Sequence, residues 1–262
     1  KNGEADIHVR NKKKYGDSEY HIEHVKYDYL FLERFSAEWY EQQFATLGSY
    51  GASALLQCNP TTRGGNMLKI DGVKVHDSLS EFPNIRYMRV WDLAHSKKQR
   101  EKDDPDWTRG TLLGVRTVKD SNGNTYDELW IKDVVGCREN ATVRDKLIDA
   151  TLTKDGQGVA IGIENSLDAK DAVVILKNIT RGRRVVKDIT IREDKVARMS
   201  YVEPIFDAGN VHILRADWNL DWFNEAREFP SGKHDDMMDN ISAGYQLCKQ
   251  QQSVLVGAVT GV

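Results

Sequence analysis

The sequence is poor in the features that mark extracellular, membrane and nucleic-acid-coating proteins. It has only three cysteines, Cys58, Cys137 and Cys248, and none of them forms a C-x-x-C pair. This argues against a disulfide framework or a cysteine-rich zinc site and favours a reducing cytosol. No apolar run approaches the roughly 20 residues that span a bilayer, and the first residues lack the apolar core of a signal peptide. We expect no membrane association, and we expect the chain to be cut from a longer one.

An excess of basic charge is also missing. The 37 Lys and Arg residues are outnumbered by 40 Asp and Glu residues, which gives a formal net charge of −3 over 262 residues. A surface that binds nucleic acid must therefore be a local patch. The balance weakens a role in coating DNA and is neutral toward an enzyme whose acidic residues bind cations.

The N-terminal part of the chain carries mixed signals. Alternation around residues 20–31 suggests a strand or an irregular extended piece. A short helix is expected over residues 37–47, with Gly48 closing it. A second short helix is expected over residues 50–57, and residues 71–83 are typical of a linker.

From residue 85 onward the pattern becomes that of an α/β fold. Strands over 85–94, 110–118 and 128–135 are joined by short connections, which predicts an antiparallel meander. The apolar run 159–163 follows a helix and is bounded by glycine loops, which suits a buried parallel strand. The remaining elements are expected as helices over 140–152, 169–179, 195–207 and 234–249 and as strands over 185–191 and 211–214.

Two carboxylates share one context in this pattern. Asp92 and Glu164 each end an apolar run predicted to be a strand, and in open α/β sheets the ligand crevice lies outside such ends. If the two strands are neighbours, the carboxylates lie roughly 5 Å apart, one strand spacing. They would repel each other unless a cation or a shared proton intervenes. Hard oxygen ligands of this kind suit Mg²⁺ or Mn²⁺ rather than zinc.

Further acidic residues lie at the start of the last predicted helix. Asp235 and Asp236 fall opposite an apolar face that can pack on the sheet. One of them could join the two strand carboxylates, and three or four carboxylates can hold two metal ions about 3.5–4 Å apart. Each residue also has a structural explanation, as a turn residue or a helix cap, so the residues alone leave both readings open. The apolar face consists of Met237, Met238, Ile241, Gly244, Tyr245 and Cys248.

Several short motifs occur in a fixed order along the chain. They are V-W-D-L-A at 90–94 with D-W-T-R-G at 106–110, I-E-N at 163–165, D-K-V-A-R at 194–198 with F-D-A-G-N-V at 206–211, and F-P at 229–230 with H-D-D-M-M-D at 234–239. In this order they resemble the C-terminal nuclease domain of the large terminase subunits of tailed phages. The N-terminal part resembles the end of the terminase ATPase region, with Cys58 and Asn59 standing where the family usually has one residue between Gln and Pro.

This resemblance implies a ribonuclease-H-like α/β fold, with a mixed central sheet flanked by helices and a small N-terminal extension that is mostly helical or irregular. It divides the chain into residues 1–82, which resemble the end of the ATPase region and the linker, a nuclease domain over 83–250, and a tail over 251–262.

The resemblance also implies an activity and a set of site residues. The activity is endonucleolytic cutting of concatemeric double-stranded viral DNA during genome packaging, by hydrolysis with Mg²⁺ or Mn²⁺, with two ions expected. The implied metal ligands are Asp92, Glu164, Asp235 and Asp236. We favour Asp235 as the principal ligand of the pair, with Asp236 assisting the second metal. Asp106, in the D-x-T element, is an accessory ligand or a turn residue beside Pro105.

Basic residues near this site are candidates for DNA contact. The densest group is Arg181, Arg183, Arg184 and Lys187, which either contacts phosphates or forms a solvated hairpin. Lys195 and Arg198 are three apart on a predicted helix, where they could reach phosphate or brace the acidic cluster. We favour bracing.

The implied partners are double-stranded DNA, an upstream ATPase domain of the same polypeptide, the portal protein and the small terminase subunit, in the cytoplasm of the infected host. The sequence contains no G-x-x-x-x-G-K-[ST] phosphate loop, so this chain should not hydrolyse ATP. Two alternatives stay open. One is another ribonuclease-H-like nuclease, of the resolvase or transposase type, and the other is a non-catalytic domain that docks on the portal and DNA.

Overall fold

The computed structural model describes residues 4–5, 10–15, 19–24, 27–28, 34–56, 67–79, 85–93, 107–164, 170–189 and 193–260. The chain divides into two units, Lys1–Leu47 and Gly48–Val262. Asp106 and the Gln57–Gly65 segment, both singled out by sequence, lie outside the described residues.

The first unit contains short strands and most of one helix. β1 (Glu4–Ala5) pairs antiparallel with β4 (Tyr27–Asp28), and β2 (Arg10–Tyr15) pairs antiparallel with β3 (Glu19–His24). An extension that is mostly helical or irregular was therefore an incomplete prediction.

Helix α1 (Ala37–Leu55) runs through Gly48 without a break. The prediction of two short helices separated at this glycine was wrong. A glycine inside a helix costs only about 1 kcal/mol relative to alanine, so it does not by itself end a helix whose flanking residues favour one.

The second unit is built on a seven-stranded sheet in the order β10-β9-β6-β7-β8-β11-β5. β6 (Tyr87–Asp92), β7 (Thr108–Lys119) and β8 (Thr125–Cys137) form the antiparallel meander expected from their short connections. β9 (Ala160–Glu164) pairs parallel with β6 and with β10 (Val186–Ile189), as its apolar run predicted. The sheet is therefore mixed, and the α/β prediction is confirmed.

The far edge of the sheet was not expected from the sequence. After the 3-10 turn Ile70–Gly72, β5 (Lys74–His76) pairs parallel with β11 (Val211–Leu214), which itself pairs parallel with β8. The prediction of a linker over residues 71–83 was wrong for its described part, 71–79, and the sheet takes in residues that precede the expected domain start at 83. A strand this short carries no readable periodicity, so only its pairing with β11 defines it.

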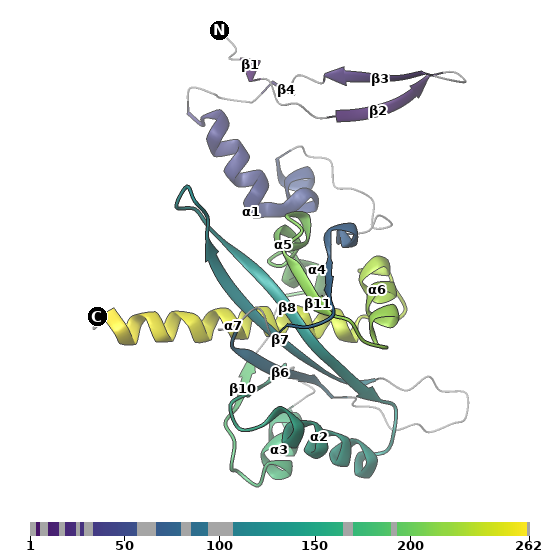
Figure 1. Cartoon of the computed structure of the whole chain (residues 1–262), viewed down its shortest axis with the longest axis vertical. Helices are drawn as coiled ribbons and strands as arrows, with labels where there is room; N and C mark the ends of the chain where they lie inside the picture. The colour runs from purple at the N-terminus through teal and green to yellow at the C-terminus, as the bar shows by residue number, and fades with distance from the viewer. Residues whose placement is uncertain are drawn as a thin grey trace. The chain divides into compact units, whose positions relative to one another are not determined.

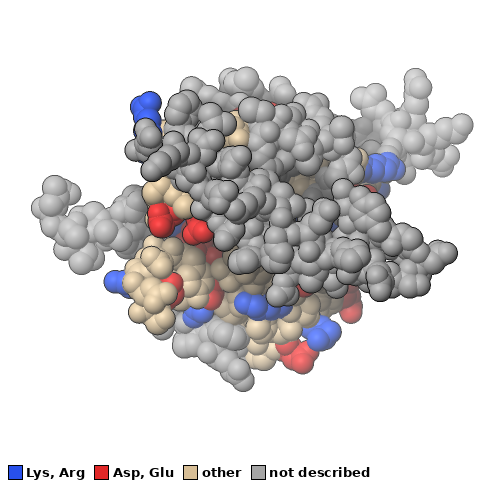
Figure 2. Space-filling view, turned by 90° about the horizontal axis from the view of Figure 1, so that it is seen from above, with Lys and Arg blue, Asp and Glu red and all other residues tan. Residues whose placement is uncertain are grey.

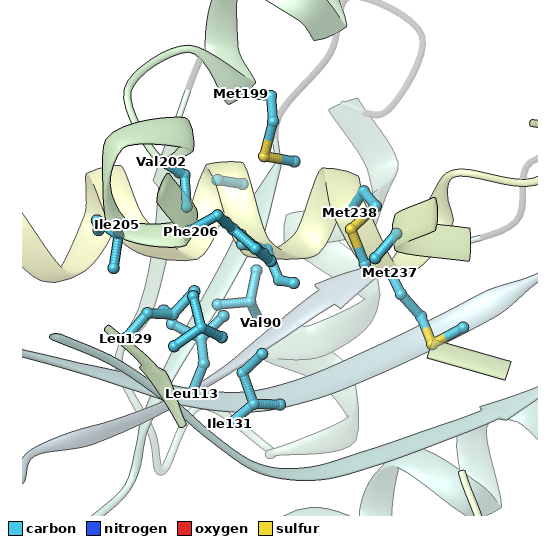
Figure 3. Packing of buried hydrophobic residues seen from close by; sticks show 14 of the residues in the cluster. Val90, Leu113, Leu129, Ile131, Met199, Val202, Ile205, Phe206, Met237 and Met238 are labelled. Carbon is cyan, nitrogen blue, oxygen red and sulfur yellow. The ribbon is translucent and has the colours of Figure 1, made fainter. Parts of the chain in front are cut away.

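Helices cover both faces of the sheet (Figure 1). Met237, Met238, Ile241 and Leu247 of α7 (Asp236–Thr260) are buried in one cluster with Val90 and Leu113 of the sheet, so the predicted apolar face of this helix is confirmed. Figure 3 shows Met237, Met238 and Phe206 on the helical side of this cluster and Leu113, Leu129 and Ile131 on the sheet side. Helix α7 continues to Thr260, so most of the expected tail over 251–262 belongs to it.

The other face is covered by α2 (Ala141–Asp155) and α3 (Lys170–Ile179). Their residues Ile148 and Leu176 are buried in a second cluster with Trp91, Ile161 and Ile163. Asn140 caps α2 as predicted, because its side chain accepts a hydrogen bond from Val143 N at 3.2 Å. The alternation of β6 between the two clusters is that of a strand buried on both sides.

Three short helices complete the α7 side. The single helix expected over 195–207 is two, α4 (Lys195–Met199) and α5 (Glu203–Asp207), because Pro204 fits only the first turn of a helix. Helix α6 (Asn219–Glu228) was missed by the sequence analysis.

One charged side chain lies at the centre of the sheet. Arg89 of β6 is fully buried and donates to both carboxylate oxygens of Asp155 at 2.8 Å, to Asp133 Oδ2 at 2.7 Å and to the Gly110 carbonyl at 3.0 Å. These contacts join β6 to β7, to β8 and to the end of α2. No sequence pattern predicted a role for Arg89.

We expect Asp155→Ala to lower the free energy of unfolding by about 3–5 kcal/mol, because it leaves a buried guanidinium short of one partner. The matched control is Asp77→Ala. Asp77 pairs with Arg215 on the surface, with side chains 83% and 65% exposed, and such pairs contribute about 0–1 kcal/mol. Urea unfolding of both variants measures the difference. Equal losses in the two variants would contradict a structural role for the Arg89 pair.

Candidate functional site

The ends of β6 and β9 meet at one edge of the sheet. The two strands are parallel neighbours, and Trp91 is in register with Ile163. Asp92 and Glu164 are the next residues on each strand, so the expectation that their strands are adjacent and end together is confirmed for the backbone. The side chain of Glu164 lies outside the described part of the chain.

Strand alternation assigns Asp92 to a face. Met88 and Val90 are buried against α7, whereas Trp91 is buried against α2 and α3. Because side chains of a strand alternate between the two faces, Asp92 follows Val90 onto the α7 face. On β9, Gly162 approaches Leu247 of α7, since a Cβ placed there would lie 2.8 Å from the leucine side chain.

The first turns of α7 lie at this same edge. Asn240 Nδ2 donates to the carbonyl oxygen of Arg109 at 3.2 Å, and Arg109 is the residue paired with Asp92 across β6 and β7. Helix α7, which begins at Asp236 directly after Asp235, therefore starts beside the strand end that carries Asp92. Segments that are more than a hundred residues apart in the sequence are brought together here, as the motif order implied.

A glutamate that the sequence analysis missed holds the start of α7. Glu225 of α6 is 7% exposed, and its Oε1 accepts hydrogen bonds from Met237 N at 2.5 Å and Met238 N at 3.2 Å. It satisfies amide groups that have no acceptor within their own helix. The sequence did contain a signal for this residue. Glu225 lies three residues after Trp222 and four before Phe229, a helical spacing that places it on the buried side of α6.

Burial disfavours negative charge at this point. It raises the pKa of Glu225 to about 7, which the amides of Met237 and Met238 oppose. Burial also raises the pKa of Asp236, as does the neighbouring carboxylate of Asp235, whereas His234 and Arg109 lower it. Carboxylates in such a setting gain from a nearby cation.

The expected braces are present. Lys195 Nζ lies 2.7 Å from Asp235 Oδ2, and Arg198 Nη2 lies 2.9 Å from Asp239 Oδ1. Both cations come from α4, and the carboxylates come from Asp235, directly before α7, and from Asp239 in its first turn. The geometry is that of bracing, the role we favoured for Lys195 and Arg198.

The other basic candidates lie in the connection between α3 and β10 or, for Lys187, on β10 itself. Arg181 and Arg183 are exposed, and Arg181 adopts a left-handed backbone with φ of 52°. Arg184 donates to the carbonyl oxygens of Leu152, at 3.0 Å, and Val159, so its guanidinium links α2 to the chain before β9. Lys187 lies on β10 and is half-buried.

Charge is mixed over the visible described surface. In Figure 2 the Lys and Arg side chains are interspersed with Asp and Glu. Among the described residues, no group of three His, Cys, Asp or Glu side chains is close enough to hold a metal ion. The side chain of Glu164 and all of Asp106 are outside that set.

Two further findings concern the cysteines and the possibility of membrane-spanning helices. Cys137 and Cys248 are both free thiols. None of the helices in the described ranges combines the length and apolarity needed to cross a membrane.

Comparison with known proteins identifies related folds. No protein family and no curated protein matches this sequence. Among solved structures, the large terminase from the thermophilic bacteriophage D6E, in complex with ADP, is similar over 80% of this chain and 52% of its own, with a TM-score of 0.55 and 10% identity. The chain thus spans about half of that protein.

Nuclease domains alone are also among the similar structures. The large terminase nuclease from the thermophilic phage G20c matches 70% of this chain and 98% of its own, with a TM-score of 0.45 and 14% identity. Its magnesium-bound form matches 71% and 98%, with a TM-score of 0.46 and 13% identity. At 10% identity, the likeness to the D6E protein is one of fold alone. The mixed sheet flanked by helices agrees with the α/β fold expected from the motifs.

The pKa of Glu225 predicts a pH dependence of stability. The pKa of Glu225 is about 7 in the folded state, above the value of 4.5 in the unfolded state. The protonated carboxyl group therefore contributes stability that is fully present below pH 4.5 and is lost as the pH rises toward 7. The loss is on the order of 3 kcal/mol. In Glu225→Gln, which keeps an oxygen for Met237 N, this decline should disappear from urea unfolding measured with EDTA. Parallel profiles for parent and variant over this window would refute the assignment.

Proposed function

We propose that this chain is a metal-dependent endonuclease that cuts double-stranded viral DNA during genome packaging. One observation carries the proposal: Asp92, the end of β9 at Glu164 and the start of α7 at Asp236 converge on one edge of the sheet. Ligands of open α/β sheets bind outside strand ends. The likeness of fold to a large terminase supports the same reading.

The residues at this edge suit a hard divalent cation. Their donors are carboxylate oxygens, which Mg²⁺ and Mn²⁺ prefer, and the raised pKa of Asp236 is what a cation would relieve. Asp92, Glu164, Asp235 and Asp236 would hold one or two ions, with Asp106 as an accessory ligand. When bound, such ions polarise the phosphoryl oxygen, lower the pKa of the attacking water and stabilise the leaving oxygen.

The division of labour within the aspartate pair follows from their partners. Asp235 is in an ion pair with Lys195 at 2.7 Å, whereas burial and the charge of Asp235 raise the pKa of Asp236. We infer that Asp236 is the principal ligand and Asp235 the assisting one, the reverse of the preference drawn from the sequence.

The neighbouring residues then have positioning roles. Lys195 orients the carboxylate of Asp235 through its ion pair, and Arg198 does the same for Asp239. Glu225 fixes the first turn of α7 through two amides, so it sets where the pair projects. Double-stranded DNA is the proposed substrate. An ATPase domain upstream in the same polypeptide, the portal protein and the small terminase subunit are the proposed partners, in the host cytoplasm.

Plasmid cleavage with Mn²⁺ or Mg²⁺ tests the activity. We expect Asp92→Asn and Asp236→Asn each to lower the rate at least about 100-fold, since each removes a carboxylate from the metal site. Asp149→Asn, an exposed position on α2, is the matched control and should cut like the parent. A parent that leaves plasmid intact with every metal would favour a docking domain. An Asp92→Asn variant as active as the parent would disprove the assigned site.

A second test concerns nucleotide. Because the sequence has no phosphate loop, ATP should neither be hydrolysed by this chain nor change its cleavage rate. Phosphate release from ATP above the level of a buffer control would overturn this expectation.

A further inference from the structure

Two arginines share one tryptophan at the edge of the candidate site. The guanidinium carbon of Arg109 lies 3.7 Å from the centroid of the Trp107 ring, and that of Arg138 lies 4.4 Å from it. Trp107 directly precedes β7, and Arg138 follows β8 one step beyond the pair Thr108 and Cys137. Neighbouring strand ends therefore present these side chains together. All three are half-buried.

The backbone is shaped to admit Arg109. Gly136 is its partner across β7 and β8, and a Cβ at that position would lie 2.7 Å from Arg109 Cδ and 3.0 Å from Nη1. Only a glycine lets the arginine side chain lie this close to β8. The Arg109 side chain thus lies over the indole of Trp107 and close to the backbone of β8 at Gly136.

Arg109 is short of acceptors in this position. Its Nε is buried and has no hydrogen-bond partner among the described residues. A guanidinium carries five N–H donors and an unmade hydrogen bond of a buried donor is costly. Burial lowers the pKa of Arg109, while Glu225 and Asp236 oppose this through their charge. The side chain remains a cation that faces the carboxylates of the site.

Arg138 extends the group toward α7. Its Nη2 lies 3.1 Å from Nε2 of His234, which directly precedes Asp235. The positive groups therefore border the strand end of Asp92, which pairs with Arg109, and the start of α7. The formal net charge of −3 gives DNA no general attraction, so phosphate contacts must come from local groups such as this one.

We propose that Arg109 and Arg138, held by Trp107, bind one phosphate group of the DNA backbone beside the metal-binding carboxylates. The planar fork of a guanidinium matches two phosphate oxygens, and stacking on an aromatic ring fixes its plane before DNA arrives. This proposal rests on the proposed nuclease function and assigns DNA contact to residues other than those of the α3–β10 connection. The competing role is internal, with Arg109 only neutralising Glu225 and Asp236.

Duplex DNA binding tests the proposal separately from cleavage. All proteins carry Asp92→Asn to prevent cutting, and fluorescence anisotropy with a duplex oligonucleotide is followed over a salt series without divalent metal. We expect Arg138→Gln to weaken binding about 10-fold and to reduce the slope of log K against log salt by about 0.9, the value for one phosphate. Arg109→Gln should do the same. Because both bind one phosphate, the double variant should lose no more slope than either single one.

Controls separate charge, geometry and folding. Arg215→Gln removes an exposed arginine elsewhere and should leave the slope unchanged. Arg138→Lys keeps the charge but loses the planar fork, so it should keep the slope and still lose affinity. It also covers the case in which Arg138→Gln fails to fold.

The outcomes are distinguishable. Affinities and slopes of both arginine variants equal to those of Arg215→Gln would overturn the proposal, and lower stability with unchanged binding would assign the arginines to the internal role. A parent that never cleaves, with the slope change intact, would sink the nuclease function and leave the phosphate site standing.

Discussion

The buried guanidinium of Arg89 is the contact on which the sheet and its site depend. It sits in the central strand β6 and bonds to the carboxylates of Asp133 and Asp155 and to the carbonyl of Gly110, so three strands and the end of α2 share one ion. Loss of one partner from a fully buried charge strongly lowers the free energy of unfolding. Asp92 follows three residues later on the same strand. The position of Asp92 at the sheet edge therefore depends on the Arg89 contact, which lies on the opposite face of the sheet.

The site itself is an edge where buried charges of both signs meet. Glu225 caps the start of α7, and its carboxyl group titrates near neutral pH because burial outweighs its two hydrogen bonds. Lys195 and Arg198 neutralise two aspartates from the α4 side. Arg109 is a cation whose Nε has no acceptor within the described part of the chain. In the proposed function the two kinds of charge have different roles. The carboxylates bind metal ions, and the arginines that border them bind the phosphate.

Part of this fold was readable from local patterns. The meander β6–β7–β8, the buried strand β9 and the apolar face of α7 were predicted because each has a periodicity long enough to stand above chance. The continuous helix α1, the strand β5 and the helix α6 were not, because a glycine, a three-residue strand and a charged amphipathic stretch say little by themselves. Pairing with β11 defines β5 and packing in the core defines α6, whereas α1 continues because the residues that flank Gly48 favour a helix.

The residue types of the site and their order were determined by the sequence alone: acidic residues after two apolar strands and at the head of the last helix. Their convergence was decided by tertiary structure, through the parallel register of β6 with β9 and the bond from Asn240 to the carbonyl of Arg109. The parts played by Arg89, Glu225 and the Arg109–Trp107–Arg138 group also appear only in three dimensions. The role of a charged group depends on its partners and on its exposure to solvent. Both are set by the fold and cannot be deduced from a one-dimensional sequence pattern.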